Sequence, residues 1–153
     1  MKVLDAMQQM IAGVDVPGIP FRLPPPVANL IGFRPVAAGQ GSTVFRMTVD
    51  REKHANPMGT LHGGIICDIA DGAMGMACAT WLEPGESFTT LELKTNFFRP
   101  VIDGELEARA RTVHKGKSLV YLECDVVTVP DEKLVAKSSS TCTILRGAQA
   151  AGR

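Results

Sequence analysis

Two aspartates interrupt a long run of apolar and small residues. Asp68 and Asp71 lie within residues 63–81, which read GGIICDIADGAMGMACATW. A carboxylate in apolar surroundings is rare unless it is paired, or acts as a general base or nucleophile. Three residues apart, the two side chains are neighbours on the surface of a helix. The pattern favours neither over the other, and a solvent-facing aspartate is the alternative interpretation.

The residues that lead into this run have the composition of a site for a carbonyl oxygen. They read TLHGG from Thr60 to Gly64. The first amides of a helix lack a partner within the helix and carry a partial positive charge. Glycine lets another group approach that backbone closely. Such a helix start stabilises the oxyanion that forms when a carbonyl is attacked, although a plain glycine-containing helix start has the same sequence.

A resemblance to a known family rests on these residues together. The segment Asn56–Gly64 reads NPMGTLHGG, and Asp71 follows His62 by nine residues. This combination resembles the hotdog-fold acyl-CoA thioesterases, in the branch of the phenylacetate-degradation (PaaI-type) and acyl-CoA thioesterase 13-like enzymes. The resemblance covers about residues 40–146. The tripeptide His-Gly-Gly alone would be weak evidence for this family. The asparagine before it and the acid after it, at these offsets, make the resemblance specific. The family's pattern favours Asp71 over Asp68.

The resemblance implies hydrolysis of an acyl-CoA, with a medium-chain or aryl-acyl group, to the free acid and CoA. Asp71 would act as nucleophile or general base, and the amide of Gly63 would polarise the thioester carbonyl. Asn56 would position the substrate or the attacking water, and Thr90 would orient the water. No metal and no cofactor are implied, since CoA enters only as part of the substrate.

Coenzyme A carries phosphates, so its site should offer cations and backbone donors. The turn at residues 115–118 reads KGKS, and the resemblance implies that the matching turn contacts the nucleotide. An ordinary β-turn with solvated lysines is the alternative. A structural role for His62 is favoured over acid–base catalysis. The residues expected to bind CoA are His62, Gly64, Phe97, Arg99, Lys115, Gly116, Lys117 and Ser118.

Helix geometry adds an independent inference about assembly. Gly63 and Asp71 are eight residues apart, or about 12 Å along a helix. An attacking group and an oxyanion donor must both lie within about 3 Å of the reacting atoms. If both residues work, Asp71 must therefore meet Gly63 of another subunit, at the interface of a homodimer with two equivalent sites. A dimer of such dimers is also expected.

The apolar patterns predict an α+β fold of the hotdog type, a curved antiparallel sheet of five or six strands around a long central helix. That helix spans about residues 61–81. Strands are predicted from residue 42 and over 88–98, 104–114, 118–129 and 133–145, because apolar residues alternate there. Residues 1–40 are predicted to form a helix (2–12), a Pro-rich arm (17–26) and a helical turn (27–33). They would pack on a hotdog domain at 41–147.

Composition restricts the possible partners. The 153 residues include 16 basic and 16 acidic side chains, so neither nucleic acid nor a membrane surface is expected as a partner. Residues 1–12 lack the apolar core of a secretory signal, which favours the cytoplasm. Small buried thiols are the expected state of the four cysteines, Cys67, Cys78, Cys124 and Cys142.

Two other functions fit parts of this pattern. A hotdog enoyl-CoA hydratase or dehydratase would pair a catalytic histidine with a carboxylate, and the offset here suits thioesterases better. A non-catalytic acyl-CoA sensor would keep the fold and the CoA turn, but would need neither Asp71 nor Asn56. The sequence leaves the role of the Pro-rich arm open.

Overall fold

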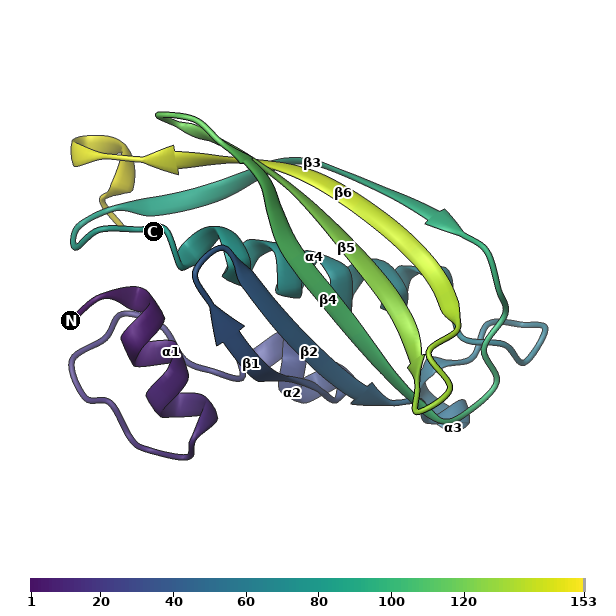
Figure 1. Cartoon of the computed structure of the whole chain (residues 1–153). Helices are drawn as coiled ribbons and strands as arrows, with labels where there is room; N and C mark the ends of the chain where they lie inside the picture. Colours follow the sequence, from purple (N-terminus) through teal and green to yellow (C-terminus); the bar gives the residue numbers. More distant parts are fainter. Residues whose placement is uncertain (153) are drawn as a thin grey trace.

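The computed structural model describes residues 1–152 (Figure 1). Six antiparallel strands form one sheet in the order β1-β2-β4-β5-β6-β3. No helix within these residues is long and apolar enough to cross a membrane. The elements are α1 Val3–Ile11, α2 Pro26–Ile31, β1 Phe33–Gly39, β2 Ser42–Thr48, α3 Arg51–His54, α4 Gly63–Ala79, β3 Ser87–Phe97, β4 Glu105–Lys115, β5 Leu119–Val129, β6 Leu134–Leu145 and the short 3₁₀ helix η1 Gly147–Ala150.

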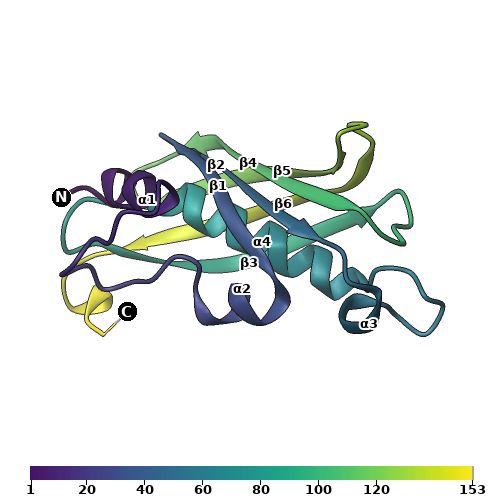
Figure 2. The same cartoon turned by 90° about the horizontal axis from the view of Figure 1, so that it is seen from below.

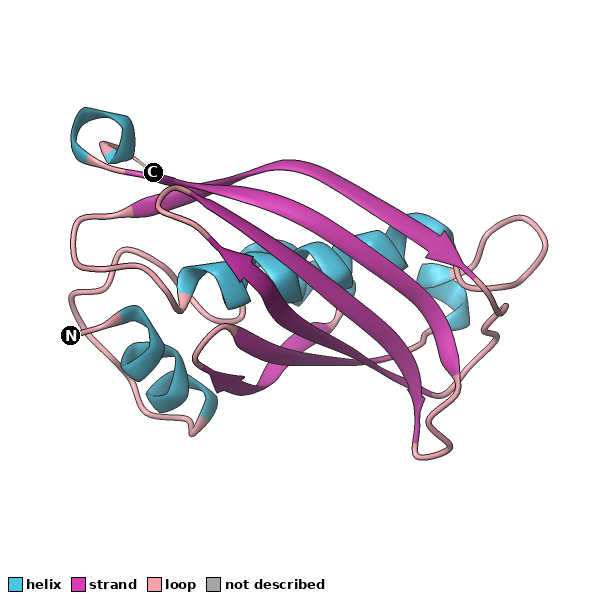
Figure 3. Cartoon of the chain, turned by 45° about the horizontal axis from the view of Figure 1, so that its top comes forward, coloured by secondary structure: helices cyan, strands magenta, loops and turns pink. Residues whose placement is uncertain are grey.

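The sheet curves around α4, which lies along its concave face (Figure 3). Because α4 packs against β2, β4 and β5, its apolar residues form the centre of the core. Ile69, Ala73 and Met74 are completely buried, as a helix with apolar residues nearly all round requires. This is the hotdog fold, so the expected α+β class is confirmed, with six strands. The helix begins at Gly63, two residues later than the earliest predicted start.

Strand β1 was not predicted. Helix α2 ends at Gly32, which adopts a left-handed conformation with φ 97°, and the chain enters β1 directly. Strand β1 then pairs with β2 in a hairpin. Pro35 lies inside β1, a residue that sequence patterns count against a strand but that an edge strand tolerates. The sheet therefore begins at Phe33, and the predicted division after residue 40 would cut this hairpin.

Strand β3 forms the other edge of the sheet, and within residues 1–152 it pairs with β6 alone. The register shifts between Thr90 and Glu92, so that Leu91 is an extra, bulged residue. A bulge reverses which side chains face each side of a strand. As a result Phe88 and Thr90 face the helix before the bulge, and Leu93 faces it after the bulge.

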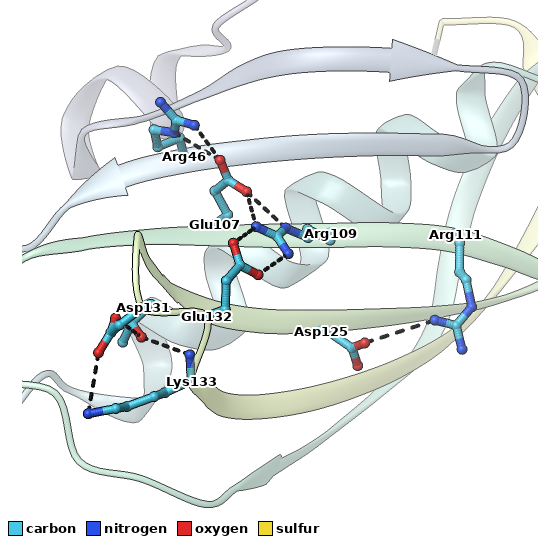
Figure 4. Close-up of polar contacts among 9 residues, drawn as sticks. Arg46, Glu107, Arg109, Arg111, Asp125, Asp131, Glu132 and Lys133 are labelled. Carbon is cyan, nitrogen blue, oxygen red and sulfur yellow. Dashed lines mark hydrogen bonds and ion pairs between the residues drawn. The ribbon is translucent and has the colours of Figure 1, made fainter.

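The outer face of the sheet carries a network of ion pairs (Figure 4). Glu107 on β4 is 7% exposed and is held between Arg46 and Arg109. Arg109 in turn donates to Glu132, with 2.7 Å between its Nη2 and Oε1 of the glutamate. The bond from Arg46 lowers the pKa of Glu107 below its usual value. These pairs satisfy the charges on the side of the sheet that faces away from α4.

Candidate active site

Asp71 lies in a pocket between the middle of α4 and the start of β3. This Asp71 pocket has a volume of about 480 Å³. The Asp71 side chain is accessible from the pocket, and the apolar walls of the pocket remove part of its hydration. Thr90 lines the same pocket. The other residues that shape it are Asp68, Gly72, Gly75 and Met76 of α4, with Phe33, Phe45 and Phe88 from the sheet.

Two glycines of α4 allow aromatic rings to reach the helix backbone. A Cβ atom on Gly75 would lie 3.3 Å from Cζ of Phe88. One on Gly72 would lie 3.2 Å from Cε2 of Phe33. Any larger residue would displace these rings, which explains glycines that otherwise weaken a helix interior by about 1 kcal/mol each. The aromatic rings make the surroundings of Asp71 apolar.

The surroundings of Asp71 alter its pKa. Burial raises the pKa of this carboxyl group, and the negative charge of Asp68 raises it further. A hydrogen bond with the Thr90 hydroxyl acts in the opposite direction and stabilises the ionised form. A raised pKa makes a carboxylate a stronger base, which suits an acid–base or nucleophilic role. The structure therefore brings together Asp71 and Thr90, two of the residues predicted to be catalytic.

The start of α4 forms a second and separate pocket of about 340 Å³. Gly63, Phe97 and Arg99 line it, so Gly63, predicted to be catalytic, lies together with two residues predicted to bind CoA. A Cβ atom on Gly63 would lie 3.1 Å from Cζ of Phe97. His62, the N-cap residue, makes no side-chain cap hydrogen bond. Its ring instead packs over Gly64. The amide of Ile65 donates to the carbonyl oxygen of His62 at 3.0 Å, whereas the amides of Gly63 and Gly64 precede the first hydrogen bonds of the helix.

Asn56 shapes the loop before α4. Its Oδ1 accepts hydrogen bonds from the backbone amides of Met58, at 3.0 Å, and Thr60, at 3.1 Å. Its Nδ2 donates to Oγ1 of Thr60 at 2.8 Å. In a single chain the side chain is thus engaged within its own loop. It fixes the path of the backbone toward Gly63, a positioning role that sequence reasoning did not foresee.

The predicted CoA turn, residues 115–118, lies near the opposite end of α4 from Gly63. The ammonium of Lys115 is 5.6 Å from the centre of the Trp81 ring, just beyond the end of the helix. Arg146 donates to the backbone oxygen of Lys117 at 2.9 Å and to Oγ of Ser118 at 3.3 Å. Arg146 was missed because it follows the last strand and no motif marks it. One chain therefore does not bring this turn near Arg99.

His54 and the four cysteines contribute to packing. His54 is buried; its Nδ1 accepts from the amide of Asp50 at 2.9 Å, and its Nε2 lies 2.7 Å from the carbonyl oxygen of Ile31. It joins α2 to α3. The cysteines are free, and Cys78, Cys124 and Cys142 are buried as predicted. The fourth, Cys67, is half-buried on α4.

A hotdog fold whose central helix carries a carboxylate in an apolar pocket defines the class of this protein. A family model described as the thioesterase superfamily matches residues 58–135, just over half of the chain. The chain belongs to this superfamily and is a thioester hydrolase.

Similar proteins agree with this assignment. A 1,4-dihydroxy-2-naphthoyl-CoA hydrolase of Listeria monocytogenes is 33% identical over 114 residues, which cover 74% of this chain and 89% of that protein. Human acyl-coenzyme A thioesterase 13 is 29% identical over 109 residues, which cover 69% of this chain and 75% of that protein. A mutant of the phenylacetic acid degradation protein PaaI from Thermus thermophilus superposes with a TM-score of 0.70 at 28% identity, covering 77% of this chain and 97% of that one.

Proposed function

We propose that this protein hydrolyses acyl-CoA thioesters at a site that two subunits share. One observation carries the proposal. Asp71 and Gly63 occupy separate pockets on the same helix, although thioester hydrolysis needs a carboxylate and an oxyanion donor around one carbonyl. A second copy of the chain supplies the missing half of each site.

In the proposed reaction, ionised Asp71 acts on the carbonyl carbon. It either attacks the carbon directly, to form a mixed anhydride that water then cleaves, or removes a proton from a water molecule that attacks. The carbonyl oxygen becomes negative, and the amide of the partner subunit's Gly63 stabilises it. The carbon–sulfur bond breaks as the carbonyl forms again, and CoA leaves as a thiolate. The thiolate takes up the proton that water loses, which Asp71 delivers in the general-base route and which is released when water cleaves the anhydride in the nucleophilic route. Thr90 keeps Asp71 ionised and orients the water.

The geometry of a two-fold dimer supports this arrangement. An axis halfway between Gly63 and Asp71, near Cys67, would run the two copies of α4 antiparallel, with each Asp71 opposite the other Gly63. Strand β3 is eleven residues long with an unpaired edge, and exposed Leu91 lies on it. A long strand edge that is left unpaired offers backbone donors and acceptors with which another chain can pair. A dimer of dimers stays a prediction from the resemblance alone.

The same dimer would assemble the CoA site. Antiparallel helices place the end of α4 in one subunit beside the start of α4 in the other. The turn at 115–118 of one subunit would then approach Arg99 of the partner subunit, and the two would provide cations for the CoA phosphates. Because the cysteines are free thiols, we also propose a reducing compartment, the cytoplasm.

The test follows release of free thiol from a panel of acyl-CoAs by the wild type and by Asp71→Asn. We expect the variant to lose about a hundredfold or more in kcat, about 2.7 kcal/mol of transition-state stabilisation, while its thermal unfolding is unchanged. Asp103→Asn, at an exposed carboxylate outside the pockets, is the matched control and should keep full activity. Binding of acyl-CoA without thiol release would favour the sensor, and hydration of an enoyl-CoA would favour the hydratase.

A further inference from the structure

The N-terminal arm encloses the largest of the pockets described, with a volume of about 590 Å³. Residues 16–21 of the arm form one wall. Ala79 and Leu82, at the end of α4, and Phe88, at the start of β3, form the opposite wall. Figure 2 shows the arm running from α1 to α2 along the side of the molecule where β3 lies. We call this space the arm pocket.

The arm pocket adjoins the Asp71 pocket. Met76 and Phe88 line both. A third pocket, of about 460 Å³, lies between them beneath residues 19–26 of the arm. It shares Pro25 and Met76 with the Asp71 pocket, and Ile19 and Met76 with the arm pocket. Met76 therefore borders all three. The adjoining pockets follow one another from Asp71 past Met76 to the inner side of the arm, and we call this sequence of pockets the course beneath the arm.

These pockets are open to the surface, and their size suits a ligand, since ligand pockets typically have volumes of about 300–1,000 Å³ with mainly apolar walls. The acidic residues at the far rim are engaged elsewhere. Glu83 pairs with Lys2 at 3.2 Å, and Glu86 pairs with Arg146 at 2.6 Å. Apart from Arg22, an exposed residue at the edge of the third pocket, the walls that remain are mainly apolar and suit an apolar occupant.

We propose that the course beneath the arm holds the distal part of a linear acyl chain whose thioester lies at Asp71. This inference rests on the proposed function and names its substrate class, medium- to long-chain aliphatic acyl-CoA rather than aryl-acyl-CoA. A flexible chain bends past Met76, whose unbranched side chain adapts to irregular spaces. A rigid aromatic acyl group would stop at the rings of Phe33 and Phe88. The Pro-rich arm is then the roof of the acyl site.

The first test measures kcat/KM of the wild type for straight-chain acyl-CoAs from butyryl to hexadecanoyl, with phenylacetyl-CoA for comparison. Each methylene that enters the course should raise kcat/KM about fourfold, until the course is filled. Values that do not rise with chain length, or a preference for phenylacetyl-CoA, would overturn the inference while the proposed function stands. Release of thiol from none of the substrates would instead contradict the proposed function.

The second test blocks the course from the arm. Ile19→Trp places a large ring beneath the roof, far along the chain from Asp71. We expect kcat/KM to fall about tenfold or more for dodecanoyl-CoA, with little change for butyryl-CoA. Val14→Trp is the matched control, because Val14 is on the same segment, is 50% exposed and lines none of the three pockets. The inference would be overturned if kcat/KM fell equally for both substrates, or if Val14→Trp lost as much kcat/KM for dodecanoyl-CoA as Ile19→Trp.

A binding measurement tests for the acyl-chain site without depending on catalysis. S-dodecyl-CoA and S-butyl-CoA are thioethers, which cannot be hydrolysed, and calorimetry gives their affinities directly. The wild type should bind S-dodecyl-CoA more tightly, and Ile19→Trp should remove most of that difference. Thermal unfolding of the variant checks that it folds. Equal affinities of the wild type for both thioethers would contradict the inference whatever the catalytic activity.

Discussion

Asp68 lies one helical turn before Asp71 on α4, and both carboxylates line the same pocket. The charge of Asp68 raises the pKa of Asp71, second only to burial. Burial also raises the pKa of Asp68 itself, whereas His62 acts to lower it. When two carboxyl groups share a site, ionisation of one opposes ionisation of the other. Asp68 thus influences the pH at which Asp71 becomes an anion.

Replacing Asp68 by Asn should move the pH dependence of the reaction. Because the substitution removes a negative charge near Asp71, the pKa of Asp71 falls, and the active anion persists to lower pH. The acidic limb of kcat/KM against pH should therefore shift to lower pH. Asp68→Glu keeps the charge and serves as control. A limb that stays in place in Asp68→Asn would show that Asp68 does not act on the titrating group.

Replacing Thr90 by Val should have the opposite effect. The hydroxyl of Thr90 stabilises ionised Asp71 by a hydrogen bond, so its loss raises the pKa of Asp71. The acidic limb should shift to higher pH, and kcat should fall on the plateau because the water loses its orientation. Thr90→Ser retains the hydroxyl and should restore the wild-type profile. If Ser and Val variants behave alike, Thr90 acts through packing instead.

The sequence predicted the parts of this protein that depend on regular periodicity. The run around Ile69 and Met74 indicated a buried helix, and alternation indicated five of the six strands. Strand β1 was not predicted, because Pro35 obscures the alternation of apolar residues along it. Leu93 faces the helix together with Phe88 and Thr90 only because of the bulge at Leu91, and a bulge leaves no periodic signal.

The arm could not be interpreted from its sequence for a related reason. Prolines fix its local conformation, but the space beneath it depends on how Ile19 and Phe21 lie opposite Met76, some 55 residues later in the sequence. Such long-range packing follows from the whole fold. The motif from Asn56 to Gly64 was recognisable in the sequence. That the Asn56 side chain bonds within its own loop is evident only from the hydrogen bonds of the structure.

The ion pairs on the outer face predict a pH-dependent stability. The folded-state pKa of Glu107 is below its usual value of 4.5, so the ionised group stabilises the fold above that value. This stabilisation is lost as the pH falls through the folded-state pKa. Glu107→Gln should lower the free energy of unfolding by about 1–2 kcal/mol at pH 7, with a smaller difference in acid. Urea unfolding at several pH values measures this.

Glu132→Gln is the matched control for that experiment. Glu132 also pairs with Arg109, but its side chain is 54% exposed, and exposed pairs contribute little. It should change stability much less than Glu107→Gln. An equal effect of the two substitutions would mean that burial of Glu107 does not strengthen its pairs.

Gly63 permits a substitution that removes a single amide. Proline is tolerated at the first position of a helix, and His62 has the extended conformation, ψ 131°, that a residue before proline requires. Gly63→Pro should reduce kcat about 10²–10³-fold if its amide binds the oxyanion. Gly63→Ala adds the same Cβ against Phe97 but keeps the amide, so it controls for displacement of that ring. Equal losses in both variants would assign the effect to Phe97.

Mixing two inactive variants tests whether one site uses residues of both subunits. Asp71→Asn and Gly63→Pro should each be nearly inactive alone. In a hybrid dimer, one site combines both defects and the other combines the intact Gly63 of the first variant with the intact Asp71 of the second. With random exchange in an equal mixture, about half of the dimers are hybrids, so about a quarter of the wild-type activity should return. Thiol release before and after unfolding and refolding of the mixture measures this. If each site lay within one chain, no mixture would contain an intact site, and activity would stay at the level of the separate variants.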